Sequence, residues 1–283
     1  MSTDIEWEKW GLQDPYFSVL TNPKFRRGEM TAEAKQDFFF SGRYHVDQVM
    51  SACRRFIDPE FTPERVLDFG CGVGRLVLPF ATIAREVVGV DISEAMLTEA
   101  RLNCAEEGIR NAVFVKSDDS LSAVDGVFDL VHTAIVLQHI DAHRGTKLVA
   151  QLLDRLAPNG IGAVQLTYAK AYHAATLGAV PPVAPPPAVP PIVAAAKSTP
   201  WLRRLFGRSA SAAQAVSPPA TPASGVANEP AVGGPAKDPE MQMNPYDLNV
   251  VLYLMQTAGI TDLRVEFTDH GGELGVFMYF RKP

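Results

Sequence analysis

A bend rich in glycine and flanked by two acids has the clearest chemical meaning in this sequence. The stretch DFGCGVG at 68–74 follows a short apolar run at 65–69 and leads into a helical pattern at 76–84. Glycines let the backbone turn tightly there and approach a bound ligand closely. Asp68 opens the bend, and Asp91 ends the next apolar run. In an open parallel sheet such a bend lies at the edge where ligands bind, so both carboxylates are expected near the ligand.

The charges around the bend distinguish two cofactors. A dinucleotide brings a doubly charged pyrophosphate, which prefers helix-terminal amides to a nearby carboxylate. S-adenosylmethionine brings an ammonium and a sulfonium, which Asp68 would stabilise. The spacing G-x-G-x-G also lacks the third glycine of the dinucleotide fingerprint, because Arg75 occupies that position. Both points favour S-adenosylmethionine over NAD, and an NAD-dependent oxidoreductase is the weaker alternative.

Further segments follow the bend in an order that resembles the class I S-adenosylmethionine-dependent methyltransferase family, of the small-molecule type. The resemblance rests on the bend and, in chain order, on the segments 88–97, 117–118, 128–132, 137–140 and 156–161. It implies S-adenosylmethionine as cofactor and methyl transfer to an O or N atom of a small-molecule or sugar-like acceptor. Because the methyl carbon is already activated, catalysis would consist of alignment for in-line displacement and exclusion of water.

The resemblance also implies roles for individual residues. Asp91 would accept hydrogen bonds from both ribose hydroxyls, and Asp118, or Asp119 in its place, would accept one from the adenine amino group. The alternative for these two neighbours is a turn-forming pair. Cys71 is interpreted as a small loop residue, not a nucleophile. The expected cofactor contacts are Asp68, Gly70, Cys71, Gly72, Gly74, Asp91, Ile92, Asp118, Asp119, Thr133, Arg43 and Tyr44.

Two histidines are the candidate catalytic residues. His132 and His139 lie near the expected position of the methyl group, where an imidazole can take a proton from a hydroxyl or amine acceptor. The alternative for His139 is packing or capping at a helix start. Residues 132–135 read HTAI, unlike the Asn/Asp-Pro-Pro-Tyr/Phe of amino-methylating DNA enzymes. Together with the net charge of −6, this argues against DNA as a partner.

The segment 1–59 before the first strand is rich in aromatic residues. We expect 7–44 to form a helical lid over the cofactor, with Arg43 or Tyr44 near its carboxylate. The alternative is a helix that packs on the sheet without touching a ligand, since burial of aromatic residues is ordinary. The three cysteines are far apart and give neither a metal-ligand spacing nor a disulfide framework, as suits a reducing cytosol.

Apolar runs alternate with helical patterns up to about 168 and again after 244. Strands are predicted at 65–69, 87–90, 112–115, 128–132, 161–168, 263–267 and 274–280. Helices are predicted at 46–57, 76–84, 93–104, 146–156 and 245–258, with Ser93 as an N-cap and Pro245 in a first turn. This pattern predicts an α/β fold with a Rossmann-like seven-stranded sheet, mostly parallel with an antiparallel last strand, and helices on both faces. The methyltransferase domain would comprise 60–169 and 244–283.

A proline-rich segment interrupts this domain. Of the 22 prolines, 14 fall between Pro181 and Pro239, and 170–243 is predicted to be a disordered Pro/Ala-rich insert. Within it, Trp201 to Arg208 has an aromatic and a basic face that would suit a membrane surface or a protein partner. The alternative is that this stretch is an ordinary part of the linker. A second hypothesis follows: a non-catalytic cofactor-binding scaffold that recruits a partner through the insert. Without a signal peptide pattern or membrane-spanning run, a cytoplasmic protein is expected.

Overall fold

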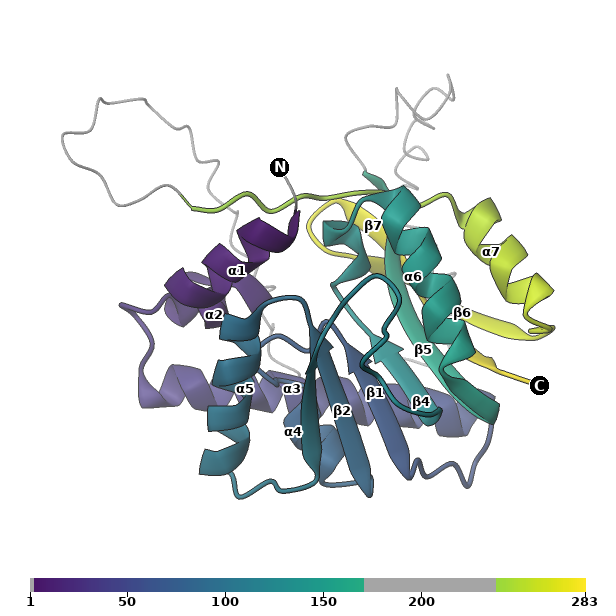
Figure 1. Ribbon diagram of the computed structural model, residues 1–283, viewed down its shortest axis with the longest axis horizontal. Coiled ribbons are helices and arrows are strands. Elements are labelled where there is room, and N and C mark those ends of the chain that lie inside the picture. The colour runs from purple at the N-terminus through teal and green to yellow at the C-terminus, as the bar shows by residue number, and fades with distance from the viewer. Residues whose placement is uncertain (1–2, 171–237) are drawn as a thin grey trace, which may run out of the picture. The chain divides into compact units, whose positions relative to one another are not determined.

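The computed structural model describes residues 3–170 and 238–283, and the statements below concern these residues. They form a seven-stranded sheet with the order β3-β2-β1-β4-β5-β7-β6 (Figure 1). The strands are β1 (Arg65–Phe69), β2 (Glu86–Asp91), β3 (Ala112–Lys116), β4 (Phe128–Thr133), β5 (Leu156–Lys170), β6 (Leu263–Asp269) and β7 (Glu273–Arg281).

The direction of the strands agrees with the sequence prediction. β1 to β5 pair in parallel, whereas β7 lies antiparallel between β5 and β6. Only residues 270–272 join β6 to β7, too few for the crossover that parallel neighbours need. The predicted α/β fold with a mostly parallel, seven-stranded Rossmann-like sheet and an antiparallel last strand is therefore confirmed.

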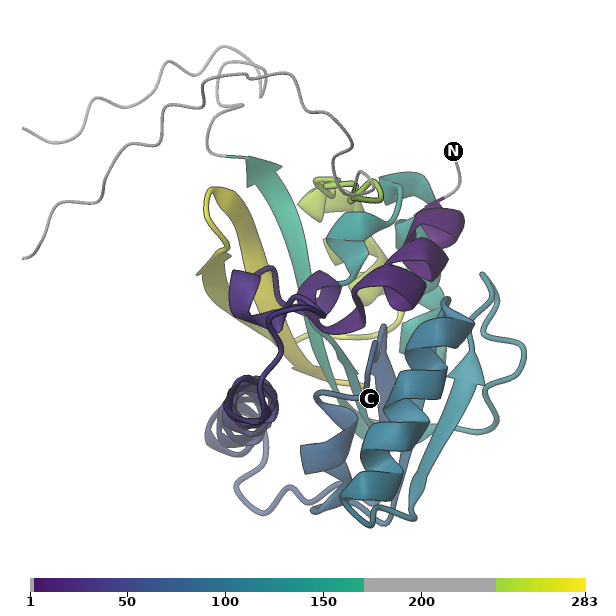
Figure 2. The same cartoon turned by 90° about the vertical axis from the view of Figure 1, so that its left-hand side faces the viewer.

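Helices lie on both faces of the sheet, also as predicted. In Figure 1, α3 runs behind the sheet and α6 in front of it, and Figure 2 shows α3 beside the sheet nearly end-on. The helices are α1 (Thr3–Gln13), α2 (Pro15–Val19), α3 (Ala32–Phe56), α4 (Val77–Ala81), α5 (Glu94–Glu106), α6 (Ala142–Asp154) and α7 (Leu248–Thr257), with 3-10 turns η1 (Pro23–Phe25) and η2 (Leu137–His139).

Alternation of side chains along β1 gives the sheet two separate cores. Val66 packs with the apolar residues of α3 and α4, whereas Leu67 and Phe69 pack with those of α6 and α7. Successive side chains of a strand point to opposite faces, so Asp68 shares the α3 face with Val66. The same rule places His132, the register partner of Asp68 on β4, on that face.

Some element boundaries differ from the predictions. Ser93 is the N-cap of α5 as expected, since its hydroxyl accepts from the Met96 amide. Pro245, in contrast, precedes α7, which begins at Leu248 behind an Asp247 N-cap. The first-turn role predicted for Pro245 is therefore wrong. A proline is also compatible with an extended approach to a helix, which local sequence does not distinguish from a first turn.

The N-terminal helices form a third apolar cluster. Trp10 of α1, Phe25 of η1 and Phe38 of α3 pack together with Val73 and with Met96 of α5. The last residues of the range predicted as the insert pack against the same region, because Arg26 binds Asp238 and the Glu6 carboxylate accepts from the backbone of Glu240. The N-terminal segment and the return segment 238–246 therefore stabilise each other.

Most of the insert predicted at 170–243, including Trp201 to Arg208, lies outside the described residues. Of that range the structure describes Lys170, at the end of β5, and residues 238–243. Within the described parts of the chain, no helix is both long and apolar enough to cross a membrane.

Candidate functional site

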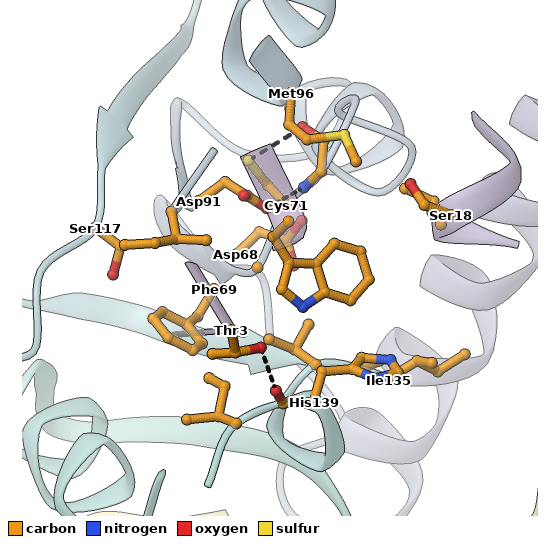
Figure 3. Close-up of a pocket in the computed structure, with 18 of the residues that line it drawn as sticks. Thr3, Ser18, Asp68, Phe69, Cys71, Asp91, Met96, Ser117, Ile135 and His139 are labelled. Carbon is orange, nitrogen blue, oxygen red and sulfur yellow. Dashed lines mark hydrogen bonds between the residues drawn. The ribbon is translucent and has the colours of Figure 1, made fainter. Parts of the chain in front are cut away.

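A cavity opens at the carboxyl ends of β1, β2 and β4, between the glycine-rich bend and the N-terminal helices. Figure 3 shows Asp68, Cys71 and Asp91 grouped together, with Thr3 bonded to the backbone of His139 across from them. Of the residues predicted from the sequence, those that line the cavity are Asp68, Gly70, Cys71, Gly72, Asp91, Ile92 and His139.

The bend adopts a conformation that suits glycine. Gly70 and Gly72 have φ angles of 75° and 52°, in the left-handed region that other residues rarely adopt. The amides of Gly70 and Cys71 both donate to the carbonyl of Val90 on β2. A β-carbon added at Gly70 would lie only 2.3 Å from a methyl group of Val136, across the cavity wall. The bend is therefore fixed against β2 and leaves no room for a larger residue at its start.

Asp91 ties the bend to the following helix. Its Oδ2 accepts from the Gly72 amide at 2.8 Å, and its Oδ1 accepts from the Ser93 amide at 2.9 Å. Burial raises the pKa of Asp91 to about 6, although backbone hydrogen bonds from Ser93 and Gly72 act in the opposite direction. An ionised carboxylate has about four acceptor positions, so lone pairs are left for donors from a ligand.

Asp68 and Arg75 place opposite charges in the cavity wall. Asp68 is 2% exposed, its Oδ1 lies 2.8 Å from Nδ1 of His132, and its Oδ2 has no partner in the described chain. Arg75 is 6% exposed and donates to the Ser41 hydroxyl, while its Nε has no partner among the same residues. Burial lowers the pKa of Arg75 to about 10, so the guanidinium is still charged at neutral pH.

Charged groups that are buried with an atom left without a hydrogen-bond partner are costly. A ligand that carries both a cation and an anion would offset this cost, with the cation beside Asp68 and the anion beside Arg75. Asp68 is identifiable from the sequence alone, whereas Arg75 stands out there only because it replaces the third glycine of the dinucleotide fingerprint. Its position directly after the bend was the signal that could have identified it.

His139 lines the opposite side of the cavity as a neutral ring. Its Nδ1 lies 2.8 Å from the backbone oxygen of Gln242. A carbonyl only accepts, so Nδ1 carries the hydrogen and Nε2 is left as an acceptor. Burial lowers the pKa of His139 to about 4, against the opposing effect of the Gln242 carbonyl. His139 is therefore suited to accept a hydrogen bond at neutral pH.

His132, the other candidate catalytic residue, does not line the cavity. It is fully buried between β4 and α3 and contacts Asp68 and His45. Strand alternation turns its side chain toward α3, so in this structure His132 does not reach the cavity in which the acceptor is expected. Thr133 is likewise buried outside the cavity, and the following residues Ala134 and Ile135 line it instead.

Asp118 and Asp119 do not line the cavity either, and Ser117 does. The Asp118 carboxylate accepts from the backbone and side chains of Ser120 and Ser122, which lower its pKa to about 2, with Ser122 the larger influence. Asp119 pairs with Arg144. The turn-forming alternative therefore describes Asp118 in this structure, and its adenine contact stays a prediction.

Three further predicted contacts lie away from the cavity. Gly74 faces Ala100 of α5. Arg43 and Tyr44 point to solvent from α3, and Tyr44 is 61% exposed. The buried face of this helix carries Gly42 and Val46, so in this structure neither Arg43 nor Tyr44 is on the side of α3 that faces the domain, and their contact with a cofactor carboxylate stays a prediction.

The N-terminal segment contributes a different set of residues, which the sequence analysis missed individually. Thr3, Asp4 and Trp7 of α1 line the cavity. The Thr3 hydroxyl donates to the His139 carbonyl, and Arg144 of α6 holds the Asp4 carboxylate with two nitrogens. These bonds fasten the first turn of α1 across the cavity, and such long-range pairings have no local sequence signal.

Ile135 is strained where it lines the cavity. Its φ of 60° is unusual for a β-branched residue. The Ile135 amide donates to the side chain of buried Gln165 at 2.7 Å, a bond that maintains this conformation. Strained backbone of this kind clusters at functional sites, which supports the assignment of the cavity as the site.

Comparisons with known proteins indicate a methyltransferase domain. Residues 66–160 match a family model described as a methyltransferase domain. The chain is 35% identical over 100 residues to an uncharacterised RNA methyltransferase of Thermosynechococcus vestitus, covering 35% of this chain and 22% of that protein. It is 32% identical over 123 residues to a 23S rRNA (uracil(1939)-C(5))-methyltransferase of Marinomonas posidonica, covering 38% of this chain and 28% of that protein. The chain thus spans about a quarter of the length of these relatives.

Two solved structures match over nearly the whole chain. Magnesium protoporphyrin IX methyltransferase from Synechocystis with bound S-adenosylmethionine has a TM-score of 0.55 at 15% identity, covering 100% of this chain and 98% of that one. The N-methyltransferase NodS from Bradyrhizobium japonicum, in complex with S-adenosylhomocysteine, has a TM-score of 0.53 at 11% identity, covering 100% of both. At these identities the likeness shows a shared fold.

Proposed function

The chain carries a class I S-adenosylmethionine-dependent methyltransferase domain, and from this premise we propose that it methylates an O or N atom of a small molecule. The observation that carries the proposal is the pair of unpartnered buried atoms, Asp68 Oδ2 and Arg75 Nε, in one cavity. The methionine part of S-adenosylmethionine has an ammonium and a carboxylate, which match these two charges.

The residues of the cavity fit the rest of the cofactor as well. Asp91 keeps acceptor positions for the ribose hydroxyls, and Ile92 and Ser117 line the same wall. Cys71 adds a small uncharged side chain, because burial raises the pKa of its thiol well above the usual value. We assign 60–169 and 244–283 to the methyltransferase domain and α1 to a lid over the cofactor.

When bound, S-adenosylmethionine supplies an activated methyl group, so the protein contributes mainly position and exclusion of water. His139 is placed to accept a hydrogen bond from the O–H or N–H of the acceptor through Nε2. Because its pKa is about 4, His139 is uncharged at neutral pH. It orients the methyl acceptor through this hydrogen bond and does not keep the proton that the acceptor gives up.

The closed position of α1 favours a small acceptor. Trp7 and His139 lie with their rings 5.0 Å apart in the cavity wall, and the Asp4–Arg144 pair holds α1 in place. A polynucleotide would need this helix to move, whereas a small molecule can be enclosed beneath it. The RNA-methylating relatives match only part of the chain, so RNA is an outcome that the test must include.

The proposed function is tested by calorimetry with S-adenosylhomocysteine and by transfer of labelled methyl groups. Acceptor pools of hydroxyl-bearing and amine-bearing small molecules are screened beside total RNA. Binding with label in a small-molecule pool is the expected result. Label in RNA alone would overturn the small-molecule acceptor, and absence of binding would overturn the cofactor.

The Asp91 carboxyl gives a prediction for pH. Because burial raises its pKa to about 6, this carboxylate becomes protonated as the pH falls below that value. It then has no negative charge with which to accept hydrogen bonds from the ligand. Affinity for S-adenosylhomocysteine should therefore fall about tenfold between pH 7 and pH 5. Calorimetry across this range measures the change. Asp91→Asn should bind weakly at both pH values, and an equally steep decline in that variant would exclude Asp91 as its source.

A further inference from the structure

A line of three polar side chains, buried Asp68 and His132 and partly buried His45, leads from the cavity into the α3 side of the domain. Asp68 Oδ1 lies 2.8 Å from His132 Nδ1, and His132 Nε2 lies 3.0 Å from His45 Nε2. The three residues come from β1, β4 and α3, so the line is made by the tertiary fold. Only Asp68 reaches the cavity.

The surroundings of this line are apolar and aromatic. The rings of Phe80 and Phe277 lie 5.3 and 6.0 Å from the His132 ring, and His132 has no exposed surface. Placing an imidazole there costs desolvation, which an apolar side chain of similar size would avoid. The polar contacts of His132 in the described chain are those to Asp68 and His45, so its presence is best explained by what it does to Asp68.

The positions of the hydrogens follow from the partners. A carboxylate only accepts, so Nδ1 of His132 donates to Asp68. His45 is neutral, because burial, together with the charges of His132, Arg75 and His270, lowers its pKa to about 2. Only one hydrogen fits between the two Nε2 atoms, and His45 supplies it when His132 carries its own hydrogen on Nδ1. His45 therefore selects the tautomer of His132 that offers a hydrogen to Asp68.

We propose that His132 is a positioning residue: it holds Asp68 Oδ1 so that Oδ2 is presented to the cofactor ammonium, and His45 fixes its tautomer. The inference rests on the proposed function and deepens it. It also gives a reason why Asp68 has one satisfied and one unpartnered oxygen, since the unpartnered Oδ2 would be left for the ligand's cation.

Two ligands and two variants test this role. S-adenosylhomocysteine carries the ammonium, whereas 5′-methylthioadenosine shares the nucleoside and sulfur but lacks the amino acid part. His132→Leu removes the donor, and His132→Asn keeps an N–H near the position of Nδ1. The Kd of each ligand is measured for each folded protein, with thermal melting as a check and exposed His143→Leu as the matched control.

His132→Leu should weaken S-adenosylhomocysteine about tenfold, the usual effect of losing one hydrogen bond to a charged group. Affinity for 5′-methylthioadenosine should stay within about twofold, and His132→Asn should recover most of the loss. Equal losses for both ligands, or no recovery in His132→Asn, would show that His132 only fills space.

Other outcomes are also decisive. If the unaltered protein does not bind S-adenosylhomocysteine, the proposed function fails and takes this inference with it. If it binds and His132→Leu binds equally well, the inference alone fails. Should His132→Leu not fold, His45→Leu and His45→Gln are compared in the same way, because glutamine keeps a donor where leucine does not. A loss specific to the ammonium in His45→Leu supports the role, and its absence contradicts it.

Discussion

Asp68→Asn is expected to weaken binding of S-adenosylhomocysteine about 100-fold, which corresponds to about 2.7 kcal/mol. The donor on His132 requires an oxygen opposite it, so the asparagine carbonyl takes the place of Oδ1. Its NH₂ group then occupies the position of Oδ2, where a donor would face the ammonium. The variant thus replaces a buried charge pair with a repulsive contact while keeping the shape of the side chain.

Calorimetry measures this loss, and Asp47→Asn is the matched control. Asp47 lies on the exposed side of α3, so the same change of charge there should leave the Kd unaltered. A loss of less than about threefold in Asp68→Asn would mean that the ammonium is held elsewhere, since charged hydrogen bonds in buried sites are worth more than that.

Gly70→Ala is expected to destabilise the protein by about 3 kcal/mol even without a ligand. Two costs add: the φ of 75° is unfavourable for alanine, and its β-carbon would lie 2.3 Å from a methyl group of Val136. Urea unfolding measures the change in the free energy of unfolding.

Gly108→Ala separates these two costs. Gly108 has a similar φ of 69°, but a β-carbon there would meet nothing within 4 Å. It should therefore show only the conformational part, about 1 kcal/mol. Equal destabilisation in the two variants would show that Val136 moves aside at no cost.

Local signals account for the parts of the site that the sequence predicted. The glycines of the bend and the acid at the end of β2 each adjoin a strand. Each of these strands can be recognised from its own short stretch of sequence. The seven strands were found for the same reason, since each is a short apolar run between turn residues. The carboxyl ends of β1 and β2 then meet because parallel strands share one ligand-binding edge.

The direction of side chains was harder to predict. Tyr44 follows Gly42 by two residues, about half a turn of helix, so a buried Gly42 requires an exposed Tyr44. The sequence pattern predicts a helix only from Val46 onward. It therefore did not indicate that Arg43 and Tyr44 belong to the same helix and lie on its exposed face. His132 and Asp118 lie outside the cavity for a similar reason, because a motif places a residue along the chain but does not determine where its side chain points.

Partners that are distant in sequence were beyond this kind of reasoning. Trp7 meets His139, and Arg144 holds Asp4, across more than 130 residues of chain. The Gln242 carbonyl, which sets the tautomer of His139, comes from the last residues of the range predicted as the insert. Each of these contacts depends on how separate elements pack, and their residue types are common at surfaces.

The place of β7 in the sheet has a consequence for how the polypeptide can be divided. β7 pairs with β5 through nine register pairs and with β6 on its other side. Residues 238–283 therefore supply two strands of the sheet. Peptide-bond cleavage anywhere between 171 and 237 would leave two pieces, the first ending in an unpaired β5 edge and the second holding the strand that covers it. The two pieces, produced separately, should therefore associate through β5 and β7 and restore the sheet. The first piece alone would be prone to self-association through its unpaired β5 edge.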